Sequence, residues 1–168
     1  TFNSFQLCHT RTSLTFSARL FSSSPPSTSG PWFALSDEQR EFQAVARKFS
    51  REEIAPIAAE FDKSCEFPWE LFKKAWSIGL LNPHVPKHCG GIDLDLLTGA
   101  IVGEELTWGC SGLAMAIGSS YLPQMGLTVG GSKEQQKKYL GRQIEQPLPS
   151  AYAVTEPGAG SDVNGVKS

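Results

Sequence analysis

The chain has 168 residues, of which 40% are hydrophobic and 19% charged, with a formal net charge of −2. That length and apolar share suffice for a domain with its own core, but no run approaches the ~20 apolar residues that cross a bilayer, so we expect no membrane span. The near-neutral charge argues against a nucleic-acid partner. The four cysteines, Cys8, Cys65, Cys89 and Cys110, form no C-x-x-C pair and are interpreted as free thiols.

Residues 1–30 differ in composition from the rest of the chain. They contain Arg11, Arg19, eight serines and five threonines but no acidic residue, whereas all 17 acidic residues lie between Asp37 and Asp162. An acid-free leader rich in Ser and carrying Arg is typical of a mitochondrial or plastid transit peptide, although a plain disordered tail has a similar composition. We expect residues 1–30 to be a leader that is removed on import.

Residues 31–146 carry apolar side chains at helical spacing and are predicted to form a helical domain. Ser36, with Gln39 three residues later, has the pattern of a capping box. It predicts the start of a long helix that runs to about Asp62. Pro56 has no backbone N–H and crowds the preceding turn, so we expect a kink or break there.

The later elements follow from periodicity and from Gly and Pro punctuation. We expect a helix from Pro68 to about Gly79, an irregular connection over 80–94 and a helix over 96–109. A tightly packed buried helix over 111–129 should follow and break near Pro123. The last helix starts at Ser132, with a second capping box that Gln135 completes and a solvated KEQQKKYLGR face, and a short strand is expected over Ser150–Thr155.

Two groups of polar residues are interpreted as structural. Glu104 and Glu105 are adjacent, and neighbours on a helix point about 100° apart, so they cannot share one site as a carboxylate pair. We interpret them as helix-face and interior contacts. His84, His88 and Cys89 lie on a loop rich in Pro and Gly without a further ligand cluster, so we predict no metal site.

The segment TEPGAGSD, from Thr155 to Asp162, follows the predicted strand. Gly158 and Gly160 permit backbone conformations and close approaches that a Cβ prevents, so the loop could lay N–H groups against an anion or a flat ring. The hydroxyls of Thr155 and Ser161 add hydrogen-bond donors. The spacing is that of neither a dinucleotide-binding motif nor a Walker loop, so a simple turn and a binding loop both remain open.

The run AYAVTEPGAGSD closely resembles the flavin-binding signature of the acyl-CoA dehydrogenase family. The upstream segments LSDEQREFQAVARKFSREEIAPIAAEFDK, AWSIGLLNPHVPKHCGG and EELTWGCSG are similar to the same family in the same order, and most similar to its medium-chain members. The resemblance covers about residues 33–168. It implies FAD as cofactor, oxidation of a fatty acyl-CoA to the trans-2-enoyl-CoA in mitochondrial β-oxidation, and a location in the mitochondrial matrix. It also implies electron-transfer flavoprotein as partner and a homo-oligomer, a tetramer in the family.

The resemblance implies a mainly α fold, with a helical domain over 31–146 and the start of a truncated middle β domain over 147–168. It assigns the flavin contacts to ten consecutive residues, with Thr155 bonding the edge of the flavin ring and Ser161 also meeting the substrate. These residues are Tyr152, Ala153, Val154, Thr155, Glu156, Pro157, Gly158, Ala159, Gly160 and Ser161.

The family's catalytic glutamate and a Trp-Ile-Thr flavin segment have no counterpart in the chain, so it contains no catalytic residue by this comparison. We expect an N-terminal fragment that is inactive alone. The alternative is a non-catalytic helical module that associates with full-length subunits or with electron-transfer flavoprotein.

Two positions depart from the medium-chain pattern. Where those enzymes carry Gln and Glu near the floor of the acyl cavity, this chain has Ala114 and Gly118. Smaller side chains would leave a deeper apolar slot, and Met115 could fill part of it again. Simple repacking of the helices, with no effect on specificity, is the alternative.

Overall fold

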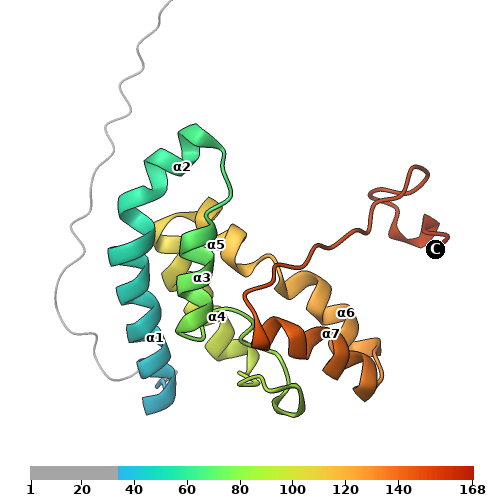
Figure 1. The fold of residues 1–168 in the computed structure, drawn as a ribbon, viewed down its shortest axis with the longest axis horizontal. Coiled ribbons are helices and arrows are strands. Elements are labelled where there is room, and N and C mark those ends of the chain that lie inside the picture. Colours follow the sequence, from blue (N-terminus) through green and yellow to red (C-terminus); the bar gives the residue numbers. More distant parts are fainter. Residues whose placement is uncertain (1–33) are drawn as a thin grey trace, which may run out of the picture. The chain divides into compact units, whose positions relative to one another are not determined.

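The computed structural model describes residues 34–168, so the leader predicted at 1–30 lies outside the described residues. Within this range the chain is helical, which confirms the mainly α prediction, and no helix is long and apolar enough to span a membrane. The elements (Figure 1) are α1 (Asp37–Phe49), η1 (Ser50–Ile54), η2 (Ala55–Ile57), α2 (Ala58–Ser64), α3 (Trp69–Ser77), η3 (Lys87–Cys89), α4 (Leu96–Gly109), α5 (Ser111–Gly118), α6 (Tyr121–Gly130), α7 (Lys133–Glu145) and η4 (Val163–Gly165).

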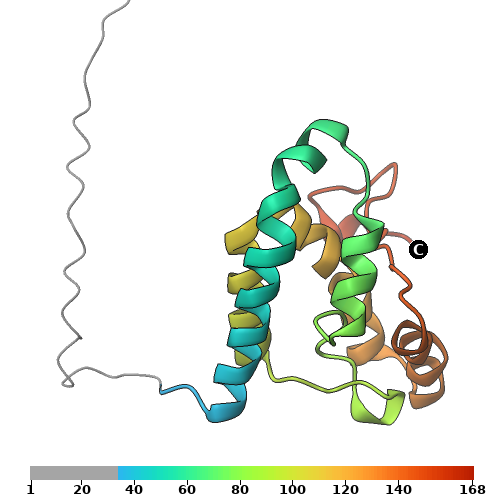
Figure 2. The ribbon, with the colours of Figure 1, turned by 60° about the vertical axis from the view of Figure 1, so that its left-hand side comes forward.

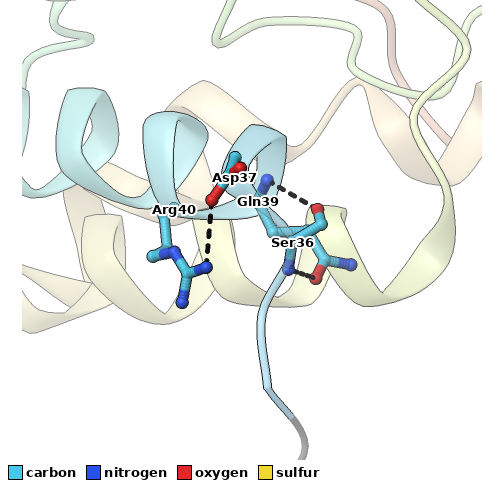
Figure 3. A network of polar contacts seen from close by, with 4 residues as sticks. All are labelled: Ser36, Asp37, Gln39 and Arg40. Atoms are coloured by element: carbon cyan, nitrogen blue, oxygen red, sulfur yellow. Dashed lines mark hydrogen bonds and ion pairs between the residues drawn. The ribbon is translucent and has the colours of Figure 1, made fainter.

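The first helix begins with the capping box that the sequence predicts. Ser36 Oγ accepts the Gln39 backbone N–H at 3.1 Å, and Gln39 Oε1 accepts the Ser36 N–H at 3.0 Å (Figure 3). The same turn carries an ion pair between Arg40 and Asp37 at 3.0 Å. The ion pair is exposed and contributes little, whereas an N-cap of this kind contributes about 1 kcal/mol to helix stability.

The expected interruption at Pro56 is confirmed as a change of helix type. Residues of η1 form a π-helical turn, in which the Ala55 N–H bonds the Ser50 carbonyl five residues back. The 3₁₀ turn η2, which contains Pro56, follows, and α2 then continues from Ala58. Because Pro56 donates no hydrogen bond, the regular ladder cannot pass through this point.

The core lies where α1 packs along α4 (Figure 2), with α3 on α5 and α7 on α6 and η3. Its main cluster consists of aliphatic and aromatic side chains from α1, η1, α3, α4, α5 and the connection after α3: Ala46, Phe49, Ile54, Leu71, Phe72, Ala75, Leu80, Leu81, Val102, Leu106, Leu113 and Ile117. A smaller cluster of Val85, Cys89 and Leu140 holds η3 against α7. The helices are therefore fixed by burial of the apolar stripes that predicted them.

The break expected near Pro123 in the segment 111–129 is present, but it lies slightly earlier, at Ser119 and Ser120, where two helices separate. Pro123 stands in the first turn of α6, where its missing N–H costs no bond. The tight burial expected for this segment is wrong, because both helices are largely open, with Met115 65% and Val129 81% exposed. Only Leu113, Ile117 and Gln124 are buried in these two helices.

The capping box of α7 is confirmed, because Ser132 and Gln135 bond each other's backbone N–H. The solvated face predicted for this helix is partly wrong. Gln136 is buried, and its Nε2 donates to the carbonyls of Leu127, Thr128 and Gly131, each at 3.1 Å. It caps the end of α6, and its polarity therefore serves an interior contact rather than solvent.

The strand predicted over Ser150–Thr155 is absent, and the described residues contain no sheet; an isolated bridge joins Glu156 to Ala159. A strand needs a neighbour for its N–H and C=O groups, and among residues 34–168 no other segment pairs with this one. After α7 the chain runs away from the helices and ends in a small turn (Figure 1). Thus the local β propensity of SAYAVT is not enough to form a strand here.

Candidate functional site

A cavity of about 390 Å³ lies between α4, α5, the start of α6 and the connection that follows α3. One face of α4 lines it, with residues at spacings of three and four: Leu96, Gly99, Ala100, Gly103 and Leu106. The opposing wall comes from α5, with Ala114, Ile117 and Gly118. The lining is mostly apolar, so the cavity suits an aliphatic ligand.

The cavity exists because small residues face one another across it. A Cβ built on Gly103 or Gly118 would meet no atom within 4 Å. Ala114 and Gly118 are four residues apart, so they share one face of α5, and both line the cavity as the sequence predicts for the slot. Met115 lies on a different face, is 65% exposed and does not line it, so the expectation that Met115 refills the space is wrong.

One wall of the cavity carries His84 and Tyr121, whose rings lie 4.7 Å apart. His84 Nδ1 lies 2.9 Å from the Leu94 carbonyl, which can only accept, so Nδ1 carries the proton. The ring occupies the space where a side chain on Gly99 would stand. Among residues 34–168 no group of three or more His, Cys, Asp or Glu side chains could hold a metal ion.

A buried polar network underlies this wall. Gln124 Nε2 donates to Asn82 Oδ1 at 2.6 Å and to Gln143 Oε1. Asn82 Nδ2 and Trp76 Nε1 both donate to the Gln143 carbonyl at 3.0 Å. Asn82 has a φ of 58°, a left-handed conformation that asparagine tolerates better than most residues. The network therefore ties α6 and α7 to the connection that forms the cavity wall.

The rim of the cavity holds the start of the C-terminal segment. Ser120, which is buried and lines the cavity, accepts the Ser150 N–H on its Oγ at 3.1 Å. Ser150 Oγ in turn donates to the Ser120 carbonyl at 3.4 Å. The segment that carries the predicted binding loop thus leaves the helices directly at the rim.

The loop itself is built on a turn at Glu156. Backbone bonds in both directions join Glu156 and Ala159, at 2.9 and 3.2 Å. The Glu156 carboxylate accepts the N–H groups of Ser168 and Lys167 at 3.1 and 3.0 Å. Hydrogen bonds from Ser168 and Lys167 also lower the pKa of Glu156. Glu156 therefore holds the turn together through both its backbone and its carboxylate.

The predicted flavin contacts lie mostly open on this segment. Tyr152, Ala153, Val154 and Thr155 are exposed, as are Pro157, Gly158, Gly160 and Ser161, whereas Ala159 is buried. Neither glycine adopts a positive φ, so the backbone conformations that only glycine permits are not used in this structure. A Cβ on either would still meet no described atom within 4 Å, which leaves room for close approach of a ring.

The hydroxyls of Thr155 and Ser161 are free to serve as donors. Both side chains are exposed and hydrogen-bond to none of the described residues. An open strip with free donors and no Cβ at two positions fits one edge of a flat, electron-rich ring. The residues present are therefore compatible with one edge of a flavin.

Glu105 is an interior contact, as the sequence predicts. It is 8% exposed and accepts hydrogen bonds from the Arg47 guanidinium, one of them at 2.9 Å. These bonds, against the opposing effect of burial, lower the pKa of Glu105. Its charge is committed to joining α4 to α1, so it is not free to act as a base at the cavity.

The described residues form a helical domain that contains a mostly apolar cavity. Residues 36–146 match the acyl-CoA dehydrogenase N-terminal domain. The chain therefore belongs to the acyl-CoA dehydrogenase family, and the resemblance drawn from its motifs is confirmed.

Relatives of known name and structure agree with this assignment. The chain is 47% identical over 136 residues to the probable medium-chain specific acyl-CoA dehydrogenase 2, mitochondrial, of Caenorhabditis briggsae, covering 81% of this chain and 33% of that protein. It is similar to butyryl-CoA dehydrogenase from Megasphaera elsdenii, with a TM-score of 0.71 and 28% identity over 81% of this chain and 37% of that one. An acyl-CoA dehydrogenase from Bacillus anthracis, solved with FAD, gives a TM-score of 0.62 and 33% identity over 79% and 23%. The chain thus spans about a third of the length of such relatives.

The sequence did not point to the residues of α4 that line the cavity. Their signal is present, because Gly99, Ala100 and Gly103 place small side chains on one face of a helix. Periodicity alone reports which face is apolar, and it does not distinguish a face that packs from one that leaves a hollow.

Proposed function

We propose that this chain forms the helical wall of the active site in a flavin-dependent acyl-CoA dehydrogenase. The reaction is oxidation of a fatty acyl-CoA to the trans-2-enoyl-CoA in mitochondrial β-oxidation, in the matrix, with electrons passed to electron-transfer flavoprotein. The observation that carries the proposal is the apolar cavity between α4 and α5, whose rim at Ser120 holds the segment with the flavin signature. The named relatives, one of them mitochondrial and one solved with FAD, support it.

In this proposal the mostly exposed segment from Tyr152 to Ser161 holds FAD, and Ser161 also meets the substrate. Bound FAD supplies the acceptor for the hydride that leaves the acyl β-carbon. The role of the chain is electrostatic, because reduction places negative charge on the ring and a preorganised donor such as the Thr155 hydroxyl stabilises that charge. The base that removes the α-proton is not among these residues, since Glu105 is engaged by Arg47.

The cavity takes the acyl chain in this proposal. Each methylene transferred from water to an apolar wall contributes about 0.8 kcal/mol, so the depth of the slot sets which chain lengths bind well. Ala114 and Gly118 leave the α5 wall without bulk, and Met115 does not compensate. We infer a slot deeper than one with Gln and Glu at these positions, and a preference for longer acyl chains.

The test is a chimera in which this chain replaces the aligned third of the Caenorhabditis briggsae relative. It should purify with bound flavin, and its visible absorbance should bleach when an acyl-CoA is added without oxygen. The unmodified Caenorhabditis briggsae protein is the matched control. Across a series of acyl-CoA lengths, the chimera should show its optimum at longer chains than this control. A chimera that folds but holds no flavin would favour the non-catalytic helical module instead.

A further inference from the structure

A second cavity, of about 380 Å³, lies between the α2–α3 turn and the junction of α4 with α5. Its walls include Phe61, Phe67 and Leu113, and it takes no part in the site described above. Two thiols line it from opposite elements, Cys65 from the end of α2 and Cys110 from the α4–α5 junction. Both are free cysteines, one exposed and one half-buried.

The wall that carries Cys65 and the wall that carries Cys110 differ in how closely they pack against the core. No residue of α2 is buried, and the backbone of Cys65 bonds only within its own turn, to the Phe61 carbonyl at 3.0 Å. Ala58 and Phe61 of α2 pack against the main core cluster, as Cys110 does, but residues 62–67, which include Cys65, are all exposed. Segments with few buried contacts open and shift at low free-energy cost. One thiol therefore lies on an exposed turn with few packing contacts, and the other on a junction that contacts the core.

The surroundings of Cys65 do not suggest a packing role. It ends α2 in a left-handed conformation, with φ 56°, at a cap position where glycine is favoured. Its Sγ has one weak contact, 3.8 Å from the Asp62 carbonyl. Metal binding does not account for the pair, since no group of three suitable ligands exists among residues 34–168.

We propose that Cys65 and Cys110 form a paired thiol modification site that a peroxide oxidises to an intramolecular disulfide across this cavity. With hydrogen peroxide, one thiol attacks an oxygen, the O–O bond breaks, and a sulfenic acid and one water form. The second thiol then attacks that sulfur, the S–O bond breaks, and the disulfide and a second water form. The two thiols lose two protons and two electrons, which peroxide accepts. Disulfides need Cα atoms about 4.4 to 6.8 Å apart, so the bond requires the exposed turn after α2 and the α4–α5 junction to come within that range across the cavity.

The experiment treats the 168-residue chain with stoichiometric hydrogen peroxide, alkylates the remaining thiols and maps the peptides without reduction. We expect a monomer with one cross-linked pair, Cys65 to Cys110, and with Cys89 unmodified. Trypsin cleavage after Lys63, at the end of α2, should slow by about tenfold in the oxidised chain and recover on reduction, since the tethered helix opens less often.

Variants separate this pairing from general oxidation. Cys65→Ser replaces an exposed side chain, so it should fold, and it should abolish both the cross-link and the trypsin protection. Cys89→Ser is the matched control and should leave both unchanged. The proposal is overturned if Cys65 pairs with Cys8 or with another molecule, or if the two thiols oxidise separately and Cys110 reacts at the same rate in the Cys65→Ser chain.

Discussion

Replacing Gln124 with leucine tests whether the buried amide network holds the cavity wall in place. The substitution keeps the size of a side chain that is 3% exposed and removes its two donated hydrogen bonds. Asn82 Oδ1 and Gln143 Oε1 then lose the side-chain donor they share. Each stranded buried acceptor costs about 1–3 kcal/mol.

One term opposes this loss. Gln124 Oε1 is itself buried without a hydrogen-bond partner among the described residues. Removing it recovers about the cost of one such group, again about 1–3 kcal/mol. Two groups lost against one recovered leave a net destabilisation of about 1–3 kcal/mol for Gln124→Leu.

Urea denaturation of the chain measures this difference. For an m-value of about 1–3 kcal/mol per molar, the midpoint should fall by roughly 1 M with the slope unchanged. Gln146→Leu, at an exposed amide just after α7, is the matched control and should change the midpoint little. A Gln124→Leu chain as stable as the parent would refute the reasoning, because it would mean that the amides are not mutually dependent.

Three further predictions follow from single contacts. Glu105→Gln should make the stability of the fold less sensitive to acid. The hydrogen-bonded carboxylate has a lowered pKa, so its contribution to stability is complete above the ordinary glutamate pKa and is lost as pH falls through the pKa of the folded state. The melting temperature of the variant should therefore change less with pH over that range than that of the parent. Ser120→Ala should speed amide exchange at Ser150 by about fivefold, as expected for the loss of one hydrogen bond worth ~1 kcal/mol, and unchanged exchange would show that this bond does not anchor the segment. Gly118→Leu should fold, because its Cβ meets open space, and should shift the acyl-CoA optimum of the chimera to shorter chains, whereas Gly126→Leu, also in open space but outside the cavity, should not.

The sequence predicts the helices well because their signals are local. Both capping boxes form, and the irregularity at Pro56 follows from the missing N–H of one residue. The break before α6 lies a little earlier than the predicted position near Pro123, because a proline in the first turn of a helix costs no hydrogen bond. Sequence spacing alone does not fix the first residue of a helix. The strand predicted over Ser150–Thr155 does not form, because pairing depends on a distant partner and not on propensity alone.

The candidate site is predicted only in part. Ala114 and Gly118 line the cavity as expected, because a spacing of four fixes them to one helix face. The burial of Gln124 and Gln136 could not be read from polarity, since a polar side chain becomes buried when another helix offers it partners. The flavin contacts assigned to the segment around Thr155 stay a prediction, because they depend on a ligand rather than on the chain's own contacts.

The most direct test of the account is the flavin midpoint potential of the chimera with Thr155→Val against the chimera without it. The hydroxyl is exposed and free of partners among the described residues, so the variant should fold unchanged. A hydrogen bond to an acceptor that gains charge is worth ~1.5–3 kcal/mol. Its loss should lower the two-electron potential by ~30–60 mV, at about 30 mV per 1.4 kcal/mol. Turnover should fall with it, whereas an unchanged potential with unchanged turnover would contradict the assignment of this segment to the flavin.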